Sequence, residues 1–395
     1  MVEWKTIKGV FETRNGYTPS TKDDSYWVDG SIPWFKMEDI RENGTILSDS
    51  KLHITHKAIK GKGLFKANSI ILATSATIGE HALIKVEHLC NQRFTNLYPK
   101  KEYVSSINMK FFYYYMFLVD IWCKQNIHQG GFASVDMEGL YKLEIPIPSL
   151  QEQQRIVGIL DTFTSSVDNL KEQITQRRKQ YEYYRDQLYY ASKADLLEAS
   201  RNGKAIVKSL DELGTFTRGR RFVRTDIVTE GVPCIHYGDM YTYYGVSAEE
   251  TPTHLAKELS SKLRFAKNGD VVIVAAGEND LDIGVGVAWL GKEPVVVHDA
   301  CFIFEHKMNP KYLSHFMRSR NYHQQIRMGV VDGKICSISA KELGRALIAV
   351  PPLSEQQRIV SILDTFEASI RNLEEQLAQR QKQYEYYRNK LLTFE

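Results

Sequence analysis

The chain contains one 39-residue sequence twice. Residues 150–188 read LQEQQRIVGILDTFTSSVDNLKEQITQRRKQYEYYRDQL, and residues 353–391 read LSEQQRIVSILDTFEASIRNLEEQLAQRQKQYEYYRNKL. The copies align without a gap, with about 27 of 39 positions identical, whereas the segments before them are far less alike. We therefore predict four blocks: a variable domain 1–149, a helical region 150–203, a variable domain 204–352 and a helical region 353–395.

Both copies carry the heptad pattern of a coiled coil. Apolar and aromatic residues recur at alternating steps of four and three over about five heptads, which places them along one seam of a long helix. The seam residues are Ile156, Leu160, Phe163, Val167, Leu170, Ile174, Arg177, Tyr181, Tyr184 and Leu188, and then Ile359, Leu363, Phe366, Ile370, Leu373, Leu377, Arg380, Tyr384, Tyr387 and Leu391. Each seam contains one arginine, which costs stability but can fix the register of the helices.

Two amphipathic helices of one sequence in one chain pack most simply against each other. Each should be roughly 58 Å long at about 1.5 Å per residue. We expect an α+β chain in which two mixed α/β domains are separated by an antiparallel coiled coil with pseudo-two-fold symmetry.

The copies are alike beyond the seam, in the segments EQQR and KQYEYYR. An internal helix pair requires only its seam positions to match, so two equivalent outer surfaces imply two copies of one partner. The residues predicted to contact it are Glu152, Gln153, Arg155, Tyr183, Arg185, Glu355, Gln356, Arg358, Tyr386 and Arg388. A helix pair that only spaces or dimerises is the alternative.

The variable blocks share a faint layout. Residues 65–79 match residues 265–284 with an insertion, and both read as a turn, a β-rich strand and a glycine-bearing loop. Each block then has an aromatic helical segment and ends in a short strand that runs into prolines. The run Phe111 to Phe117 is predicted to be core. These features predict two domains of one fold with different surfaces.

Composition narrows the class of protein. The hydrophobic fraction of 43% and the charged fraction of 25% are typical of globular domains. The chain has no run of 18 or more apolar residues, and its five scattered cysteines lack metal-site spacing. Free thiols are typical of the cytoplasm, where we expect the protein to act. A net charge of only +3 means that any nucleic-acid contact must rest on local basic patches or on a partner.

A globular block that ends in a proline-bounded strand, followed by EQQRI and a long helix, occurs twice. This arrangement resembles the specificity subunits of type I restriction–modification enzymes, over the whole chain and most strongly at IPIPSLQEQQRIVGILD and VPPLSEQQRIVSILD. The resemblance implies that each variable block is a target-recognition domain for one half of a split DNA site. It also implies that the repeated helices dock two methyltransferase (modification) subunits, with restriction and translocase subunits in the full complex.

The sequence lacks the motifs that catalysis would need. No Asn/Asp-Pro-Pro-aromatic motif is present for holding a flipped adenine, and no GKS/T loop for a phosphate. The glycines near Gly286 are spaced for a hairpin or bulge. The histidine pairs at 53 and 56 and at 81 and 88 lack a third ligand at useful spacing. We expect a non-catalytic chain without cofactor or metal, with methylation and cleavage supplied by partners.

The resemblance to a DNA reader directs attention to polar and basic loops. Four arginines within seven residues, 218–224, could grip phosphates or reach guanine edges. The equivalent stretch of the first domain and the glycine-bounded loops of both domains add short polar candidates. The residues predicted to contact DNA are Arg14, Tyr17, Ser75, Thr77, His128, Gln129, Arg218, Arg220, Arg221, Arg224, Glu278, Asn279, Arg327 and Lys334.

The favoured hypothesis is therefore a DNA-specificity subunit that reads an asymmetric, bipartite site. A helix pair of about 58 Å spans at most roughly 17 base pairs, so we expect half-sites about one helical turn apart. A coiled-coil adaptor that holds two copies of a protein partner and ignores DNA is the rival hypothesis. A standalone enzyme is disfavoured by the missing motifs.

Overall fold

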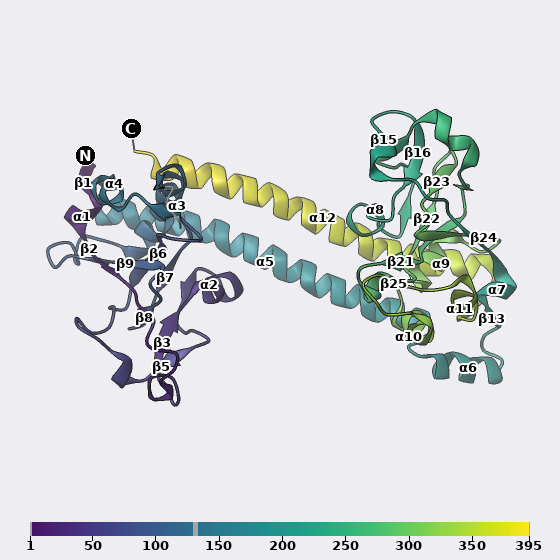
Figure 1. Cartoon of the computed structure of the whole chain (residues 1–395), viewed down its shortest axis with the longest axis horizontal. Coiled ribbons are helices and arrows are strands. Elements are labelled where there is room, and N and C mark those ends of the chain that lie inside the picture. The colour runs from purple at the N-terminus through teal and green to yellow at the C-terminus, as the bar shows by residue number, and fades with distance from the viewer. Residues whose placement is uncertain (1, 129–132, 395) are drawn as a thin grey trace. The chain divides into compact units, whose positions relative to one another are not determined.

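The computed structural model describes residues 2–128 and 133–394 (Figure 1). The chain divides into two compact units: the first contains residues up to Asn169 and from Gln376 onward, and the second contains Leu170–Glu375. The long helices α5 (Leu150–Leu188) and α12 (Leu353–Leu392) each contribute one half to both units. Each unit is thus an α/β domain joined to one part of each helix.

The domain of the first unit is built around a five-stranded sheet of order β2-β9-β6-β7-β4. A three-stranded sheet, β5-β3-β8, and the pairs β1-β12 and β10-β11 complete it. Its elements are β1 (Glu3–Thr6), α1 (Ile7–Val10), β2 (Phe11–Asn15), η1 (Asp24–Tyr26), β3 (Ile32–Phe35), α2 (Met37–Asn43), β4 (Ile46–Leu47), β5 (His53–Ile54), η2 (His56–Ala58), β6 (Ser69–Ala73), β7 (His81–Ile84), β8 (Leu89–Cys90), β9 (Phe94–Pro99), α3 (Met109–Gln125), β10 (Ile127–His128), β11 (Ser134–Val135), α4 (Met137–Lys142) and β12 (Glu144–Ile147).

The domain of the second unit repeats this sheet as β14-β24-β20-β22-β17. A second five-stranded sheet, β15-β18-β16-β23-β19, stands in place of the three-stranded one, and β13-β26 and β21-β25 form pairs. Its elements are α6 (Lys193–Arg201), β13 (Val207–Ser209), α7 (Leu210–Leu213), β14 (Gly214–Arg218), η3 (Arg224–Asp226), β15 (Ile227–Val228), β16 (Val232–Ile235), α8 (Asp239–Thr242), β17 (Ser247–Ala248), β18 (Thr253–Leu255), η4 (Lys257–Lys262), β19 (Phe265–Ala266), β20 (Val271–Val274), β21 (Ala276–Gly277), η5 (Asp280–Asp282), β22 (Gly286–Trp289), β23 (Val295–Val297), β24 (Cys301–His306), α9 (Pro310–Phe316), α10 (Arg320–Ile326), η6 (Arg327–Gly329), β25 (Cys336–Ser337), α11 (Ala340–Gly344) and β26 (Leu347–Ala349).

The predicted common fold of the two variable domains is confirmed by pairing as well as by strand order. In both five-stranded sheets the first four strands are antiparallel and the last strand, β4 or β17, pairs in parallel. The central strands β6 and β20 are buried at every residue, which explains the apolar runs 70–73 and 271–274.

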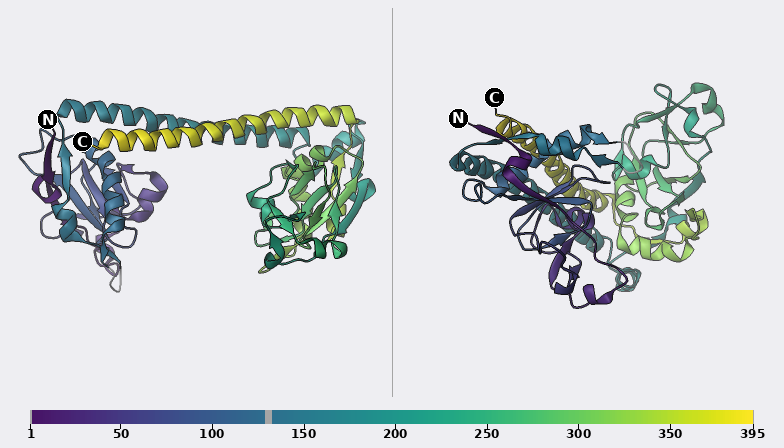
Figure 2. Two further views of the ribbon diagram at one scale, coloured as in Figure 1. Left: turned by 90° about the horizontal axis from the view of Figure 1, so that it is seen from above. Right: turned by 60° about the vertical axis from the view of Figure 1, so that its left-hand side comes forward.

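The aromatic helix α3 belongs to the core of the first unit, as predicted. Phe111 and Phe112 are fully buried, and the ring of Phe112 meets that of Phe11 edge-on at a centroid distance of 5.3 Å. In each unit the domain lies on one side of the helix pair (Figure 2).

Within the first unit, the start of α5 packs against the end of α12. Phe163 stacks on Tyr387 with ring centroids 5.3 Å apart, and the guanidinium of Arg380 lies 5.9 Å from the Phe163 ring. Leu160 and Leu392 share the buried core nearby.

Within the second unit, the same contacts recur with the two helices exchanged. Phe366 stacks on Tyr184 at 5.4 Å, and Arg177 lies 6.0 Å from the Phe366 ring. Arg178 pairs with Glu374 at 2.5 Å, so residue numbers fall along one helix as they rise along the other and the packing is antiparallel. Each seam arginine therefore lies close to the ring of a phenylalanine on the other helix.

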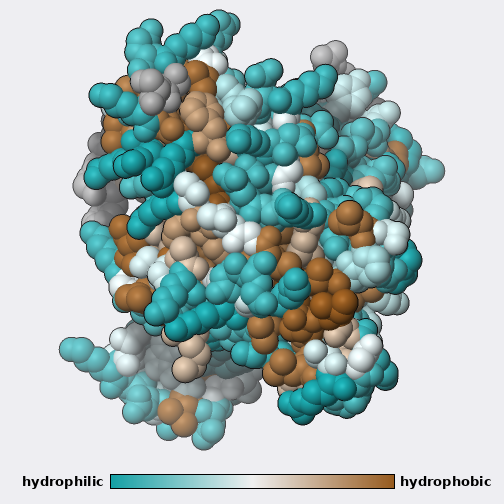
Figure 3. All heavy atoms as spheres, turned by 90° about the vertical axis from the view of Figure 1, so that its right-hand side faces the viewer, coloured by the Kyte–Doolittle hydropathy of each residue, from teal (hydrophilic) through white to brown (hydrophobic). Residues whose placement is uncertain are grey.

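None of the described helices is long and apolar enough to cross a membrane. All five cysteines are free and buried. The space-filling view of the second unit shows apolar side chains exposed in groups among hydrophilic ones (Figure 3).

Candidate DNA interface and partner surfaces

The four predicted DNA-binding arginines of the second domain are exposed and lie in one short segment, residues 218–224, which we call the basic loop. It begins at the last residue of β14 and ends at the first residue of η3. The backbone N–H of Gly219 donates to the carbonyl of Cys301 at 3.0 Å, and that of Arg220 donates to Val297 at 3.0 Å. A Cβ on Gly219 would lie 2.2 Å from the carbonyl oxygen of His298, so this close approach requires glycine. The strand β24 and the loop before it therefore hold the backbone of this segment. The Arg218 side chain is partly used, because its Nε donates to the carbonyl of Asp299 at 2.8 Å, whereas the side chains of Arg220, Arg221 and Arg224 are exposed toward solvent.

An aromatic and histidine cluster supports this loop. Phe222 is buried, and its ring meets the His298 ring edge-on at a centroid distance of 4.9 Å; the His236 ring lies 5.1 Å from that of His298. Burial lowers the pKa of both histidines. A neutral imidazole can both donate and accept a hydrogen bond. The sequence did not reveal this cluster, because its members are up to 76 residues apart and are brought together only by strand pairing.

The strand β21 joins the basic loop to the other predicted loops of the second domain. The N–H groups of Ala275 and Ala276 both donate to the carbonyl of Ala300, in the segment that holds the basic loop. On its other side β21 pairs with β25. The predicted residues that follow or flank these strands are all exposed: Glu278, Asn279, Arg327 and Lys334. The Asn279 side chain is partly used, because its oxygen accepts the N–H of Leu281 at 3.1 Å and caps η5.

The first domain has the same edge with different side chains. The N–H of Thr74 donates to the carbonyl of Arg93 at 2.9 Å, and the N–H of Val135 donates to the carbonyl of Thr74 at 2.9 Å. Ser75 and Ser134 form an antiparallel bridge that corresponds to the pairing of β21 with β25. We call these corresponding regions the loop edges of the two domains. The loop edge of the first domain contains Ser75, Arg93 and His128, and that of the second contains the basic loop and the loops that follow β21 and precede β25.

Two predicted DNA contacts of the first domain are committed to the fold. The Arg14 guanidinium donates to the carbonyl of Gly63 at 2.7 Å and lies 4.0 Å from the Phe65 ring centroid, and burial lowers its pKa. The Tyr17 hydroxyl donates to the carbonyl of Ala58 at 2.9 Å and accepts the N–H of Lys60 at 2.8 Å. Both side chains brace the loop around residues 58–65, so we remove them from the predicted DNA surface.

The remaining predictions for the first domain fall at its loop edge. Ser75 is half-buried and forms a backbone bridge with Ser134, so it remains a candidate. The Thr77 hydroxyl is buried without a hydrogen-bond partner and is withdrawn as a DNA contact. His128 is exposed and lies 3.4 Å from Asp136, whereas Gln129 lies outside the described residues. The sequence missed Arg93, which is exposed beside Thr74. Its position just before β9 corresponds to that of Ala300 before β24, a signal that only the structural alignment of the domains provides.

The outer helix surfaces begin with a repeated ion pair. Arg155 forms a two-pronged pair with Glu152 at 2.7 and 2.6 Å, and Arg358 forms the same pair with Glu355 at 2.8 and 2.7 Å. The arginine in each pair holds the pKa of the glutamate below its usual range. Each unit thus presents an identical, oriented charge pair at the start of one helix.

The predicted role of Gln153 and Gln356 in partner contact is wrong. Both side chains are buried. Gln153 accepts the N–H of Asn108 at 2.8 Å, and Gln356 accepts the N–H of Asn309 at 2.9 Å; their amide groups donate to backbone carbonyls. The glutamines lock each domain onto its helix, and their identity in both copies reflects this shared joint.

A second repeated contact reinforces the joint. Lys110 pairs with Asp161 at 2.8 Å in the first unit, and Lys311 pairs with Asp364 at 2.6 Å in the second. His315, Asp364 and Glu367 lie close enough to suggest a metal site, but His315 is buried beside Asp364 and the ammonium of Lys311 already occupies that carboxylate. We therefore assign this group to domain docking.

Among the C-terminal residues of the repeats, the tyrosines are exposed to solvent, whereas the arginines pack against the domains. Tyr183 and Tyr386 are 61% and 60% exposed and remain candidates for partner contact. Arg388 instead lies 4.6 Å from the Phe117 ring of its own domain, and only 12% of the Arg185 side chain is exposed. These arginines stabilise the domain side of the helices, so we withdraw them from the predicted partner surface.

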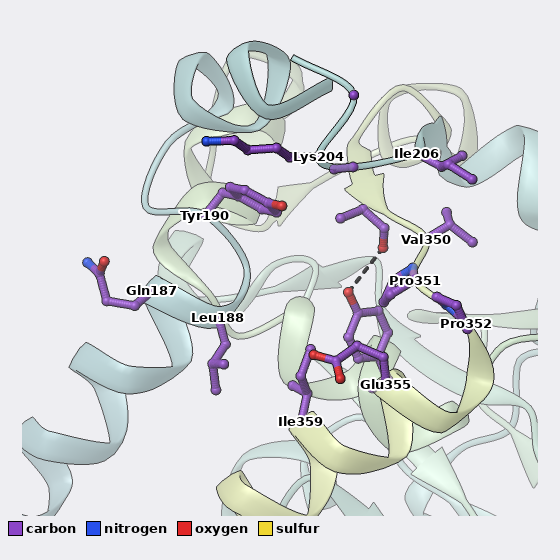
Figure 4. A pocket seen from close by; sticks show the side chains of 14 residues that line it. Gln187, Leu188, Tyr190, Lys204, Ile206, Val350, Pro351, Pro352, Glu355 and Ile359 are labelled. Carbon is purple, nitrogen blue, oxygen red and sulfur yellow. Dashed lines mark hydrogen bonds between the residues drawn. The ribbon is translucent and has the colours of Figure 1, made fainter. Parts of the chain in front are cut away.

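In the second unit, the end of α5 and the start of α12 line a common cavity of about 550 Å³ (Figure 4). Glu355 and Ile359 of α12 face Leu188 at the end of α5, and the segment after α6 closes the cavity with Lys204 and Ile206. The start of one helix and the end of the other therefore form a single composite surface.

In both units the contacts that join the α/β domain to its helix are the same, whereas the loop edges differ. This combination is typical of a binding protein that arose by duplication. The chain matches the model described as Type I restriction modification DNA specificity domain over residues 1–177 and again over 202–380. It belongs to this family.

Curated relatives agree with that assignment. The chain is 45% identical over 238 residues to the type I restriction enzyme EcoprrI specificity subunit of Escherichia coli, a match that covers 58% of each chain. It is 27% identical over 432 residues to a putative type I restriction enzyme specificity subunit of Haemophilus influenzae, covering 100% of this chain and 96% of that one. The EcoR124I/EcoR124II specificity subunit matches at 36%, over 48% of its length, so the matched segments span about half of these two Escherichia coli relatives.

The fold is similar to that of a structure titled as the basis of complex assembly and conformational transition of the type I R-M system. The TM-score is 0.65 at 16% identity, over 99% of this chain and 97% of that one. The S subunit of a type I restriction–modification system from M. genitalium matches with a TM-score of 0.53 at 15% identity, over 100% of this chain and 97% of that one.

Proposed function

We propose that this chain is the DNA sequence-specificity subunit of a type I restriction–modification complex. Each domain reads one half of an asymmetric, bipartite site through its loop edge. The observation that carries this proposal is the pairing of one repeated fold with two different edges: four exposed arginines in the second domain, and Ser75, Arg93 and His128 in the first. Domains of one fold with different edge chemistry select different base sequences.

The side chains suggest how each edge divides its work. Arginines of the basic loop neutralise phosphates or donate two hydrogen bonds to a guanine edge. Glu278 is an exposed carboxylate that can accept a hydrogen bond from the amino group of cytosine. In the first domain, the hydroxyl of Ser75 suits either kind of base edge.

Methylation and cleavage belong to partner subunits in this proposal. Two modification subunits dock on the composite helix surfaces, one formed by Glu152, Arg155 and Tyr386 and the other by Glu355, Arg358 and Tyr183. The identical ion pairs and the similar exposure of the two tyrosines support two equivalent docking sites. Restriction subunits complete the assembly, and the working compartment is the cytoplasm.

The decisive experiment is selection of a binding site from random duplex DNA by the full-length chain assembled with its modification subunits. A split site with two different halves is expected. Arg218, Arg220, Arg221 and Arg224 are then replaced together by glutamine, which should weaken binding. The slope of log affinity against log salt should fall by about 0.9 for each phosphate that the variant no longer neutralises.

The matched control removes four exposed cations away from the loop edge, by replacing Arg201, Lys208, Lys267 and Lys292 with glutamine. Both variants lose the same net charge. If they lost the same DNA affinity, the basic loop would act only through its overall charge and not through specific contacts. Binding with no base preference at all would reject DNA recognition and favour the protein adaptor.

A further inference from the structure

The loop edge of the second domain exposes four large apolar side chains. Leu281, Met328, Val331 and Ile335 are 72%, 96%, 66% and 62% exposed, and we call them the apolar patch. Exposed apolar side chains that gather in one place mark an interaction surface, because they gain nothing from water and contribute little to the core.

Backbone pairing brings the two loops that carry the patch together. In the antiparallel pair β21-β25, Gly277 lies opposite Cys336, so Glu278, just after β21, and Ile335, just before β25, leave the pair at the same end. Val331 and Ser337 exchange backbone hydrogen bonds of 2.8 and 3.1 Å and close the hairpin.

The other ends of these loops also meet. A Cβ placed on Gly284, after Leu281, would lie 2.4 Å from Cδ1 of Ile326, immediately before η6 and Met328. The patch is therefore a surface formed by two adjoining loops.

Core packing does not explain these four residues. Their neighbours Ile283, Ile326, Cys336 and Ile338 are buried in the main hydrophobic cluster of this unit and anchor both loops. The chain thus alternates buried residues that anchor the loops with apolar residues that are exposed to solvent.

We propose that the apolar patch contacts the 5-methyl groups of thymines in the major groove of the second half-site. This inference rests on the proposed function and adds to it the kind of base that is read. Thymine is the base whose major-groove edge carries a methyl group, and apolar side chains contact it there. Four separate aliphatic side chains over two loops suit a row of methyl groups.

The charges around the patch favour base edges over phosphates. Arg327 and Lys334 flank it and attract the duplex, whereas Glu278, Asp280 and Asp282 would repel a phosphate placed directly on it. The basic loop is available to hold the DNA backbone. It bonds to the carbonyls of Val297 and Cys301, and the carbonyl of Ala300 between them accepts the N–H of Ala276 in β21. This division leaves the patch facing the floor of the groove.

The test exchanges thymine for uracil in the selected half-site, which removes only the methyl group. The full-length chain, assembled with its modification subunits, should bind each substituted duplex about three- to fourfold more weakly per contacted methyl group. A variant combining Leu281→Asn, Met328→Gln, Val331→Thr and Ile335→Thr should bind the thymine duplex more weakly and lose its sensitivity to uracil. Val28→Asn, at a position of the first domain that is 59% exposed, should retain that sensitivity.

The outcomes separate this inference from the proposed function. A clear second half-site without thymine, or one that tolerates uracil, overturns methyl contact and leaves DNA recognition standing. Failure to select any half-site overturns the proposed function itself. If the patch variant instead releases a modification subunit at unchanged intrinsic DNA affinity, the patch is a protein-docking surface and the inference is wrong.

Discussion

Two glycines control how the loop edges are built. A Cβ on Gly16 would lie 2.2 Å from the carbonyl oxygen of Cys90, and one on Gly219 would lie 2.2 Å from that of His298. The same close approach in both domains indicates that the loop after the first sheet strand must press directly on the neighbouring backbone. At this scale the two domains are alike even where their side chains differ.

Replacing Gly219 with alanine should displace the basic loop. The expected result is a loss of about 1–3 kcal/mol in the free energy of unfolding of the second unit, together with weaker DNA binding. Gly245→Ala is the control, because its Cβ would meet no atom within 4 Å and should change stability by less than about 0.5 kcal/mol. Unchanged urea unfolding and unchanged DNA affinity for Gly219→Ala would contradict this account of the loop.

Buried histidines should make stability depend on pH. Burial lowers the pKa of His88 in the first unit and of His306 in the second to about 4. Unfolding restores a pKa of about 6.5, so below that value the unfolded state takes up a proton that the folded state refuses. Stability is therefore present above about pH 6.5 and is lost as the pH falls toward 4.

The loss between pH 7 and pH 5 should be about 2 kcal/mol per histidine. His88→Phe keeps an aromatic ring between Phe35 and Phe65 and should flatten the pH dependence of unfolding of the first unit. Urea midpoints at the two pH values measure the effect. A variant as pH-sensitive as the parent would show that His88 is not the titrating group.

At the scale of elements, the sequence predicted the long helices well. The seam from Ile156 to Leu188 contains enough heptads for the periodicity to be unmistakable, and the stacking of Phe163 on Tyr387 follows from it. Burial off the seam was not predictable. Gln153 looked like a surface residue, yet it satisfies the N–H of Asn108, which is distant in sequence.

The loop edges were predicted only in part, because several of their contacts join segments that are distant in sequence. A cluster of arginines is visible in sequence because the residues are consecutive. The stacking of Arg14 on Phe65 and the support of Phe222 by His298 arise from contacts between distant segments, so a sequence pattern carries no trace of them. Arg93 escaped notice because a single cation before a strand is common.

The composite helix surfaces should each hold one partner. Replacing Tyr183, Glu355 and Arg358 with alanine should give a complex with one modification subunit in place of two, because the other surface is intact. The equivalent variant at Tyr386, Glu152 and Arg155 should do the same, and the combined variant should bind none. Native mass measurement of the complex reports the number of subunits. The control is Thr175→Ala, at an exposed helix position where the second copy already has alanine. Two subunits retained by the combined variant would rule out these surfaces.

At the scale of the whole molecule, the repeat predicts that a fragment with one domain and one long helix can pair with a second copy of itself. A fragment of residues 1–203 has α5 but lacks α12, so Phe163 loses its partner Tyr387. The equivalent residue Tyr184 lies on α5 itself and stacks on Phe366 in the full chain. Two copies of the fragment can therefore restore both contacts by pairing their α5 helices.

We expect this fragment to dimerise and to recognise a palindrome made of its own half-site. Sedimentation equilibrium measures the dimer, and Phe163→Ala with Tyr184→Ala should dissociate it. A fragment that is folded and strictly monomeric would contradict the equivalence of the two seams.

The central claim is that two domains of one fold read two different half-sites. It is tested most directly by sequencing the bases methylated by the reconstituted complex, before and after residues 204–352 are replaced by a second copy of residues 1–149. The account predicts an asymmetric split motif for the parent chain and a palindromic motif, built from the first half-site, for the replaced chain. A contiguous motif, or a motif unchanged by the replacement, would contradict it.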